Sequence, residues 1–317
     1  MKFWALLFVL CCQPLLALES AAQSAAEQFP ALELANTHVH QLPAKNSDRQ
    51  YEVWIDLPGS YGKSTKKMPV LFVTDANYAF PLIRSIRNRL GANGQNIEDF
   101  VIVGLSYAKG HTPINSRSLD YTPTDVLARP KKPGESYSGA AYGGSAVYIE
   151  YLRQQVIPFV LKNYQVYPTR KVFVGHSYGG LLGAELLLRY PDSFDSYIIS
   201  SPSLWFDQKH LMKLVEARSQ QSPAIHATAL LYAAEFEQIK PGARYSKEVD
   251  IVADLLKFEQ RLKASTTPAV NAKTNAPQGL HIKSRIIADE DHLSVFPSMI
   301  SRALVELLPG YGPYTPG

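Results

Sequence analysis

One serine of this chain lies among glycines in the stretch VFVGHSYGG, residues 172–180. The spacing Gly175-x-Ser177-x-Gly179 follows an apolar run and precedes LLGAELLLRY, a segment typical of a helix. Between a strand and a helix, this pattern forms a nucleophile elbow, a sharp turn that exposes the serine hydroxyl above a sheet. The pattern therefore predicts that Ser177 is a nucleophile, with a helix-capping serine as the alternative.

A serine nucleophile needs a histidine base and an acid, which can follow later strands of the same sheet. The apolar segment TALLYAA precedes Glu235-Phe-Glu237, and HIKSRIIA precedes the loop that holds His292. His292 is the predicted base because it follows the last strand, whereas His176 adjoins the serine on a tight turn, where neighbouring side chains diverge. Glu237 is the predicted acid and Glu235 the alternative, because the longer offset lets the chain turn toward His292.

Acyl transfer also needs N–H groups that stabilise the oxyanion of the tetrahedral intermediate. The backbone N–H of Tyr178, directly after the nucleophile, is predicted to be one of them. The other is expected from the loop after the third strand, in the segment TDANY, residues 74–78. Within this segment, Ala76 and Asn77 are both candidates for the second donor.

These residues need a sheet whose strands present them at one edge. The segment 49–58 alternates in polarity like an antiparallel strand, whereas 68–75 and 99–107 are continuous apolar runs like strands buried on both faces. Further strands are expected at 196–200, 228–234 and 281–288, and helices at 145–164, near 208–219, near 246–264 and at about 293–308. Strands separated by helices predict an α/β fold with a mostly parallel sheet between two helical layers.

The segment from Gly110 to Gly144 is rich in Pro, Gly, Ser and Tyr and is predicted to be a long loop. Loops of this length are usually functional or mobile. Arg117 lies on it, three residues before Asp120, so it is expected either to pair locally or to contact substrate. Trp205 follows the strand 196–200 and is expected either in the core or in a wall of the pocket.

The N-terminal segment MKFWALLFVLCCQPLLALES combines one lysine, a short apolar run and small residues suited to processing. It predicts a secretory signal and cleavage region over 1–22 and a polar tether over 23–36. Cys11 and Cys12 both lie in the signal, so the processed chain would carry no thiol in the periplasm or outside the cell. The alternatives are that the N-terminus is kept as an anchor or that Cys11 or Cys12 carries a lipid, although neither cysteine follows the small residue expected there.

Length and charge restrict the number of domains and the kinds of partner that we expect. The 317 residues, 46 % of them hydrophobic, suffice for one large α/β domain, expected over 37–310 with a tail over 311–317. The 32 basic and 28 acidic residues form no basic block, so nucleic acid is not an expected partner. No central segment has the length of uncharged sequence that a membrane span needs. The oligomeric state stays open.

Several segments, in the same order, resemble one protein family. VLFVTDANYAF, RSLDYTPT, GGSAVYIEYLRQQVIPFV, VFVGHSYGGLLGAELLLRYPDSF and SSPSLWFD are similar to the enterobactin-esterase-like branch of the α/β-hydrolases, which is related to esterase D. The resemblance extends from about His38 to Leu308, and GHSYGG with SPSLW are its most specific elements. The chain differs from the family's usual glycine at Ala76, in the oxyanion loop, and at Ala234, before the acid.

The resemblance implies an α/β-hydrolase fold and a serine esterase that acts on a small-molecule ester without a cofactor. Ser177 and His292 match the family's catalytic positions, Glu237 matches the acid less closely, and Arg117 matches an arginine near the substrate. Trilactone catecholate siderophores are the substrates of the best-known members. A general short-acyl carboxylesterase, an esterase D-like thioesterase and an acyltransferase are the alternatives.

Two other classes of function have less support. A non-catalytic binding module would not need an acid and a histidine at the ends of later strands, and the sequence has both. The pair His38-Val-His40 has the spacing of a metal-binding strand, but it is expected before the first full strand and without further ligands. No metal site is therefore predicted.

Overall fold

The computed structural model describes residues 32–91, 94–132, 135–219, 222, 224–266 and 279–312. The predicted signal and most of the predicted tether and tail lie outside these residues. The compact unit that begins at Thr37 contains every element discussed below. Within the described ranges, no helix combines the length and the apolar character that a membrane span requires.

Eight strands of the described chain form one sheet in the order β1-β2-β4-β3-β5-β6-β7-β8. They are β1 (Thr37–Gln41), β2 (Glu52–Asp56), β3 (Met68–Val73), β4 (Val101–Leu105), β5 (Val166–His176), β6 (Ser196–Ser200), β7 (Ala227–Ala234) and β8 (Leu280–Ile287). β2 pairs antiparallel with β1 and β4, and all other neighbours pair in parallel. The predicted α/β-hydrolase fold, with its mostly parallel sheet, is confirmed.

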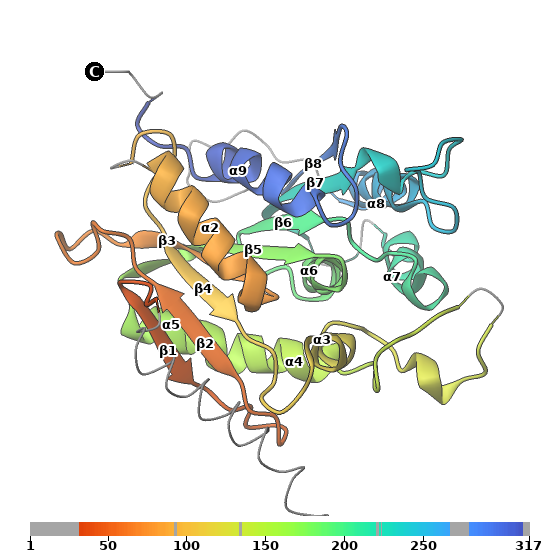
Figure 1. The fold of residues 1–317 in the computed structure, drawn as a ribbon, viewed down its shortest axis with the longest axis horizontal. Helices are drawn as coiled ribbons and strands as arrows, with labels where there is room; N and C mark the ends of the chain where they lie inside the picture. Colours follow the sequence, from red (N-terminus) through yellow and green to blue (C-terminus); the bar gives the residue numbers. More distant parts are fainter. Residues whose placement is uncertain are drawn as a thin grey trace, which may run out of the picture. The chain divides into compact units, whose positions relative to one another are not determined.

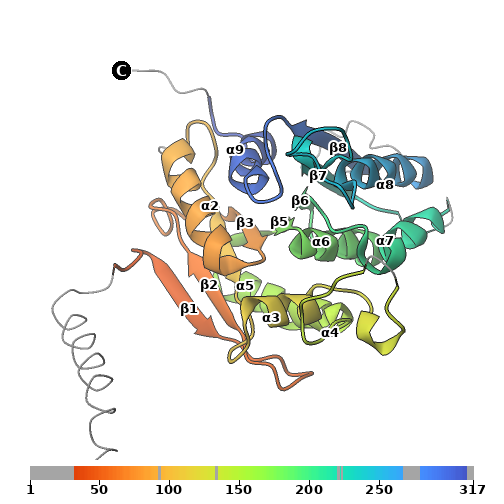
Figure 2. The ribbon, with the colours of Figure 1, turned by 45° about the vertical axis from the view of Figure 1, so that its right-hand side comes forward.

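The helices cover both faces of this sheet, which explains why its central strands are apolar on both sides. Val70 and Phe72 of β3 belong to one core layer, and Leu71 and Val73 belong to the other. Figures 1 and 2 show α2 and α9 on one face and the remaining large helices on the other. The first face carries α2 (Ala76–Gly91) and α9 (Val295–Leu307). The second face carries α4 (Ser145–Tyr151), α5 (Ile157–Asn163), α6 (Tyr178–Arg189), α7 (Phe206–Glu216) and α8 (Ile251–Ser265).

The predicted long loop contains a helix that the sequence analysis missed. Helix α3 (Pro113–Asp120) begins after Thr112, whose hydroxyl accepts a hydrogen bond from the Asn115 N–H at 3.2 Å. A threonine cap followed by proline at the first helical position is a common helix start. The proline- and glycine-rich composition of the whole segment concealed this local signal.

The histidine pair lies in a strand, contrary to the expectation that it precedes the first one. His38 and His40 belong to the short edge strand β1. His40 Nε2 lies 2.6 Å from the Tyr164 hydroxyl, and His38 is exposed. Among the described residues, no group of three His, Cys, Asp or Glu side chains could hold a metal ion.

The parallel strands bring the predicted site residues to one edge of the sheet. Asp75, Ser177, Glu237 and His292 each follow the carboxyl end of a parallel strand, namely β3, β5, β7 and β8. Because carboxyl ends of parallel strands meet at a common edge, loops that are distant in sequence converge there.

Candidate active site

Ser177 occupies a strained turn between β5 and α6. Its backbone angles are φ 58° and ψ −116°, a region that non-glycine residues rarely adopt and that costs about 1–3 kcal/mol. The turn is so tight that a Cβ on Gly175 would lie 2.1 Å from the carbonyl oxygen of Gly179. Gly175 is therefore required by close backbone contact, and the turn presents the Ser177 hydroxyl to a pocket.

His292 and Glu237 form a short contact at the same edge. His292 Nδ1 lies 2.5 Å from Glu237 Oε1. The other oxygen of this buried carboxylate, Oε2, accepts hydrogen bonds from the Ser201 hydroxyl and the Ala234 N–H, both at 2.7 Å. Both carboxylate oxygens are thus occupied, which fixes the orientation of the carboxylate against the imidazole.

Glu235, the alternative acid, has other partners. Its side chain accepts hydrogen bonds from the Tyr245 hydroxyl at 2.8 Å and from the Asp289 N–H at 3.0 Å. Glu235 and Glu237 are the first and last residues of one short turn after β7, η3 (Glu235–Glu237). The turn directs Glu237 inward to His292 and Glu235 outward to the loop after β8.

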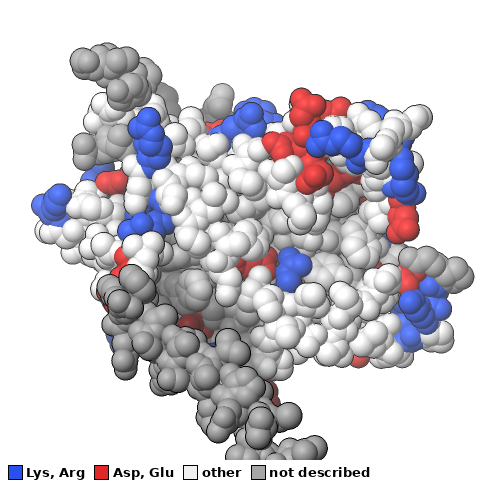
Figure 3. Space-filling model, in the orientation of Figure 1, with Lys and Arg blue, Asp and Glu red and all other residues white. Residues whose placement is uncertain are grey.

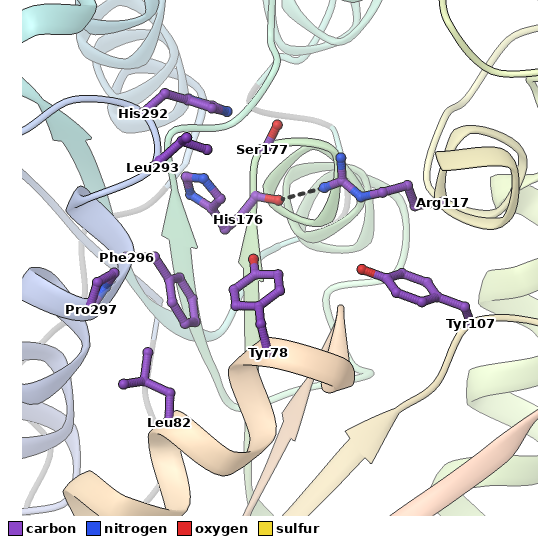
Figure 4. Close-up of a pocket in the computed structure, with 10 residues that line it drawn as sticks. All are labelled: Tyr78, Leu82, Tyr107, Arg117, His176, Ser177, His292, Leu293, Phe296 and Pro297. Atoms are coloured by element: carbon purple, nitrogen blue, oxygen red, sulfur yellow. Dashed lines mark hydrogen bonds between the residues drawn. The ribbon is translucent and has the colours of Figure 1, made fainter. Parts of the chain in front are cut away.

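The ring of His292 extends toward the Ser177 hydroxyl, and both residues line the same pocket (Figure 4). Ser177 Oγ itself lies 3.5 Å from Ser203 Oγ, at the long limit of a hydrogen bond. Hydrogen bonds between catalytic groups are often long until substrate binds. With Nδ1 of His292 occupied by Glu237, its Nε2 is the nitrogen that can serve Ser177.

His176 is buried beneath this pair and does not compete for the serine. Its Nδ1 lies 3.1 Å from the Ser200 hydroxyl, and its ring centroid lies 4.7 Å from that of His292. Burial, and to a lesser extent the neighbouring His292, lowers the pKa of His176 to about 3. A neutral, enclosed imidazole in this position supports the ring of His292.

The candidate oxyanion donors lie at the first turns of two helices. Tyr178 begins α6, and Ala76 and Asn77 begin α2. N–H groups in the first turn of a helix have no intrahelical acceptor and are free to bind an anion. The two helix starts are in contact, because a Cβ on Gly179 would lie 2.3 Å from Thr74 Oγ1. The choice between Ala76 and Asn77 stays open.

Arg117 contacts this same loop and is not paired with Asp120. Its Nε lies 3.0 Å from Asp75 Oδ1, and its Nη2 donates to the His176 carbonyl at 3.4 Å. Burial disfavours the charged guanidinium, but the adjacent Asp75 carboxylate outweighs it and raises the pKa of Arg117. Asp120 pairs instead with Arg49 at 2.7 Å. The alternative that Arg117 pairs locally, with Asp120, is therefore wrong, because its partner Asp75 is 42 residues away in the chain.

The pocket has a volume of about 600 Å³. Figure 4 shows the residues that line it: Tyr78, Leu82, Tyr107, Arg117, His176, Ser177, His292, Leu293, Phe296 and Pro297. The apolar part of its wall was not predicted from the sequence, although Leu82 lies one helical turn after Tyr78, the last residue of the oxyanion segment 74–78. Trp205 is not among these residues; its half-buried ring packs against Tyr178, with centroids 6.3 Å apart.

Charge is sparse over the central part of the face seen in Figure 3, where Lys, Arg, Asp and Glu side chains gather mainly toward the periphery. This distribution fits the sequence, in which basic and acidic residues are nearly balanced. A small molecule is a better match for such a face than a polyanion, which needs a continuous basic surface.

Comparisons with known proteins relate this chain to esterases. The model of the family described as Putative esterase matches residues 44–251. Ferri-bacillibactin esterase BesA of Bacillus subtilis is 27% identical over 291 residues, covering 90% of this chain and 93% of that protein. The siderophore triacetylfusarinine C esterase of Aspergillus fumigatus is 29% identical, covering 75% of this chain and 80% of that protein.

A solved structure extends the similarity to the fold. Siderophore hydrolase EstB from Aspergillus nidulans superimposes with a TM-score of 0.71 at 19% identity, covering 89% of this chain and 98% of that chain. The described elements thus follow an architecture that is shared over nearly the whole of that protein.

Proposed function

The chain belongs to the Putative esterase family and hydrolyses ester bonds, and we propose that it does so through an acyl-enzyme on Ser177. The observation that carries the proposal is the convergence of Ser177, His292 and Glu237 at one sheet edge, with the 2.5 Å contact between the last two. An acid that orients a histidine, and a histidine that accepts the proton of a serine, constitute the machinery of serine acyl transfer.

In the proposed mechanism, Ser177 Oγ attacks the ester carbonyl while His292 Nε2 accepts the hydroxyl proton. Glu237 orients the ring and stabilises the imidazolium that forms. The oxyanion of the tetrahedral intermediate accepts hydrogen bonds from the Tyr178 N–H and from an N–H at the start of α2. His292 then donates its proton to the leaving alkoxide, and a water molecule activated by His292 hydrolyses the acyl-enzyme.

A siderophore ester is the proposed substrate class. The two relatives described above are named as esterases, one of ferri-bacillibactin and the other of the siderophore triacetylfusarinine C. In this chain, the charged Arg117 beside Ser177 would offer planar donors to the acidic oxygens of a catecholate trilactone. Secretion through the segment 1–22 would place the enzyme in the periplasm or outside the cell.

Covalent labelling tests the mechanism directly. A serine-directed fluorophosphonate is expected to add to Ser177 and to abolish turnover of p-nitrophenyl acetate, because the site activates this hydroxyl. Intact-mass spectrometry and peptide mapping would identify the labelled residue. Prolonged treatment with EDTA is expected to leave turnover unchanged. Loss of turnover with EDTA and its recovery with zinc would contradict the proposal.

Substitution of Arg117 tests the substrate class. Removal of Arg117 alone would leave the buried Asp75 carboxylate without a counter-charge and with the Tyr107 hydroxyl as its donor, so the informative variant is Arg117→Ala combined with Asp75→Asn. A hydrogen bond to a charged group contributes about 1.5–3 kcal/mol. We expect the ratio of kcat/KM for an anionic catecholate ester to that for butyryl ester to fall by about one to two powers of ten.

The control for this experiment is Arg153→Ala, which removes a half-buried arginine that pairs with Asp192 and lies over the Tyr190 ring. It should leave the ratio unchanged. An unchanged ratio in the Arg117 variant would mean that the arginine only holds the loop. A wild-type enzyme without preference for the catecholate would instead indicate a general carboxylesterase.

A further inference from the structure

The pocket beside Ser177 has two chemically different walls. Leu82, Leu293, Phe296 and Pro297 lie on one side, and Tyr107 and Arg117 lie on the other (Figure 4). The apolar wall comes from α2, from the first turn of α9 and from the loop that holds His292. Ser177 lies between the walls, so an ester bound to it must place one half against each.

The position of His292 determines which half of the ester lies against which wall. The leaving alkoxide must take its proton from His292 Nε2, so its oxygen has to lie within about 2.6–3.2 Å of that nitrogen. Leu293 is the next residue in the chain, and Phe296 lies in the first turn of α9. The group attached to the leaving oxygen therefore meets the apolar wall.

The acyl half is directed to the other wall. In the tetrahedral intermediate, the carbonyl carbon is bonded to Ser177 Oγ, and its oxyanion faces the N–H groups of α6 and α2. Once the leaving group points toward His292, the remaining bond points toward Arg117 and Tyr107. Arg117 stays charged there because Asp75 is 3.0 Å away.

We propose that the pocket sorts the two halves of its substrate by polarity. The apolar or aromatic part of the alcohol half packs on the Leu293–Phe296 wall, and an acidic group of the acyl half lies beside Arg117. This assignment rests on the serine mechanism proposed above and names the kind of ester that the mechanism serves.

The apolar wall has one fixed part and one exposed part. Phe296 is 2% exposed, and its ring packs edge-on against Tyr78 with centroids 5.6 Å apart. Leu293 is 83% exposed, although it adjoins His292. Phe296 therefore forms a fixed base of the wall with little accessible surface, whereas Leu293 offers apolar area that the alcohol half would bury on binding.

Two esters of one acid isolate the alcohol wall. 2-Naphthylmethyl hydrogen succinate and methyl hydrogen succinate form the same succinyl-enzyme and differ only in the leaving alcohol. For Leu293→Ser, the ratio of kcat/KM for the naphthylmethyl ester to that for the methyl ester is expected to fall about tenfold, since most of one leucine contact is lost. The matched control Leu256→Ser, at a 47% exposed leucine on α8, should leave this ratio unchanged.

Deacylation distinguishes contact with the alcohol from general damage to the site. The succinyl-enzyme no longer holds the alcohol, so its hydrolysis rate should be the same whichever ester formed it, and the Leu293→Ser effect should be confined to acylation. Rapid-quench mass spectrometry would follow both steps. A decrease in the deacylation rate as large as that in the acylation rate would overturn the assignment.

A third ester tests the direction of binding. Carboxymethyl 2-naphthylacetate reverses the polarity, with an apolar acyl half and an acidic alcohol half. The wild-type enzyme is expected to favour the naphthylmethyl succinate at least tenfold in kcat/KM, and the opposite preference would overturn the assignment of the walls. If no ester is cleaved and the fluorophosphonate does not label Ser177, the serine mechanism itself fails, and the assignment fails with it.

Discussion

Ser177→Ala is expected to lower kcat by several powers of ten while the protein remains folded. The substitution removes the nucleophile, and alanine tolerates the strained turn no worse than serine does. Only stabilisation by the oxyanion donors and substrate binding would remain, which leaves a rate roughly 10³–10⁴ above that in water. Single-turnover kinetics with a p-nitrophenyl ester would measure the loss, and circular dichroism would verify the fold.

The interdependence of the residues is the stronger test. His292→Ala alone should cost nearly as much as Ser177→Ala, and the double variant should be scarcely slower than either, because the two side chains act as a unit. Ser203→Ala is the control, since its hydroxyl is 3.5 Å from Ser177 Oγ but has no assigned proton to transfer; its loss should be far smaller. Additive losses for Ser177 and His292 would contradict a shared proton transfer.

Glu237→Gln is expected to lower kcat by about 10³- to 10⁴-fold, the size of loss that follows when the acid of a catalytic triad is replaced by its amide. The structure supplies the reason. The carbonyl oxygen of the new amide would still accept from Ser201 and from the Ala234 N–H, so that its NH₂ group would face His292 Nδ1. That nitrogen would then have to accept, which moves the ring proton to Nε2 and prevents Nε2 from receiving the proton of Ser177.

Glu235→Gln provides an isosteric control two residues away. Its partners, the Tyr245 hydroxyl and the Asp289 N–H, both donate, and an amide oxygen can accept from either. We expect a change in kcat of only a fewfold. Steady-state kinetics of both variants on the same ester would decide the identity of the acid, since a larger loss in Glu235→Gln would move that role to Glu235.

The order of the strands and of most helices could be predicted from the sequence, because it depends on local patterns of residues. Apolar runs between helices predicted the parallel sheet, and Gly175-x-Ser177-x-Gly179 predicted a turn in which backbone contact excludes side chains. The strand ends after which Glu237 and His292 follow were likewise visible in the sequence. Helix α3 and strand β1 were not predicted from the sequence, because elements this short contain too few residues to show a periodic pattern of apolar side chains.

The sequence indicates which residue types reach the active edge, since parallel strands must end there. Which of these side chains contact one another depends on the packing of the loops. The short turn after β7 brought Glu237, and not Glu235, against His292, and the loop after β3 brought Asp75, and not Asp120, against Arg117. Contacts of this kind depend on how loops far apart in the chain pack on one another, and no spacing within a single segment encodes them.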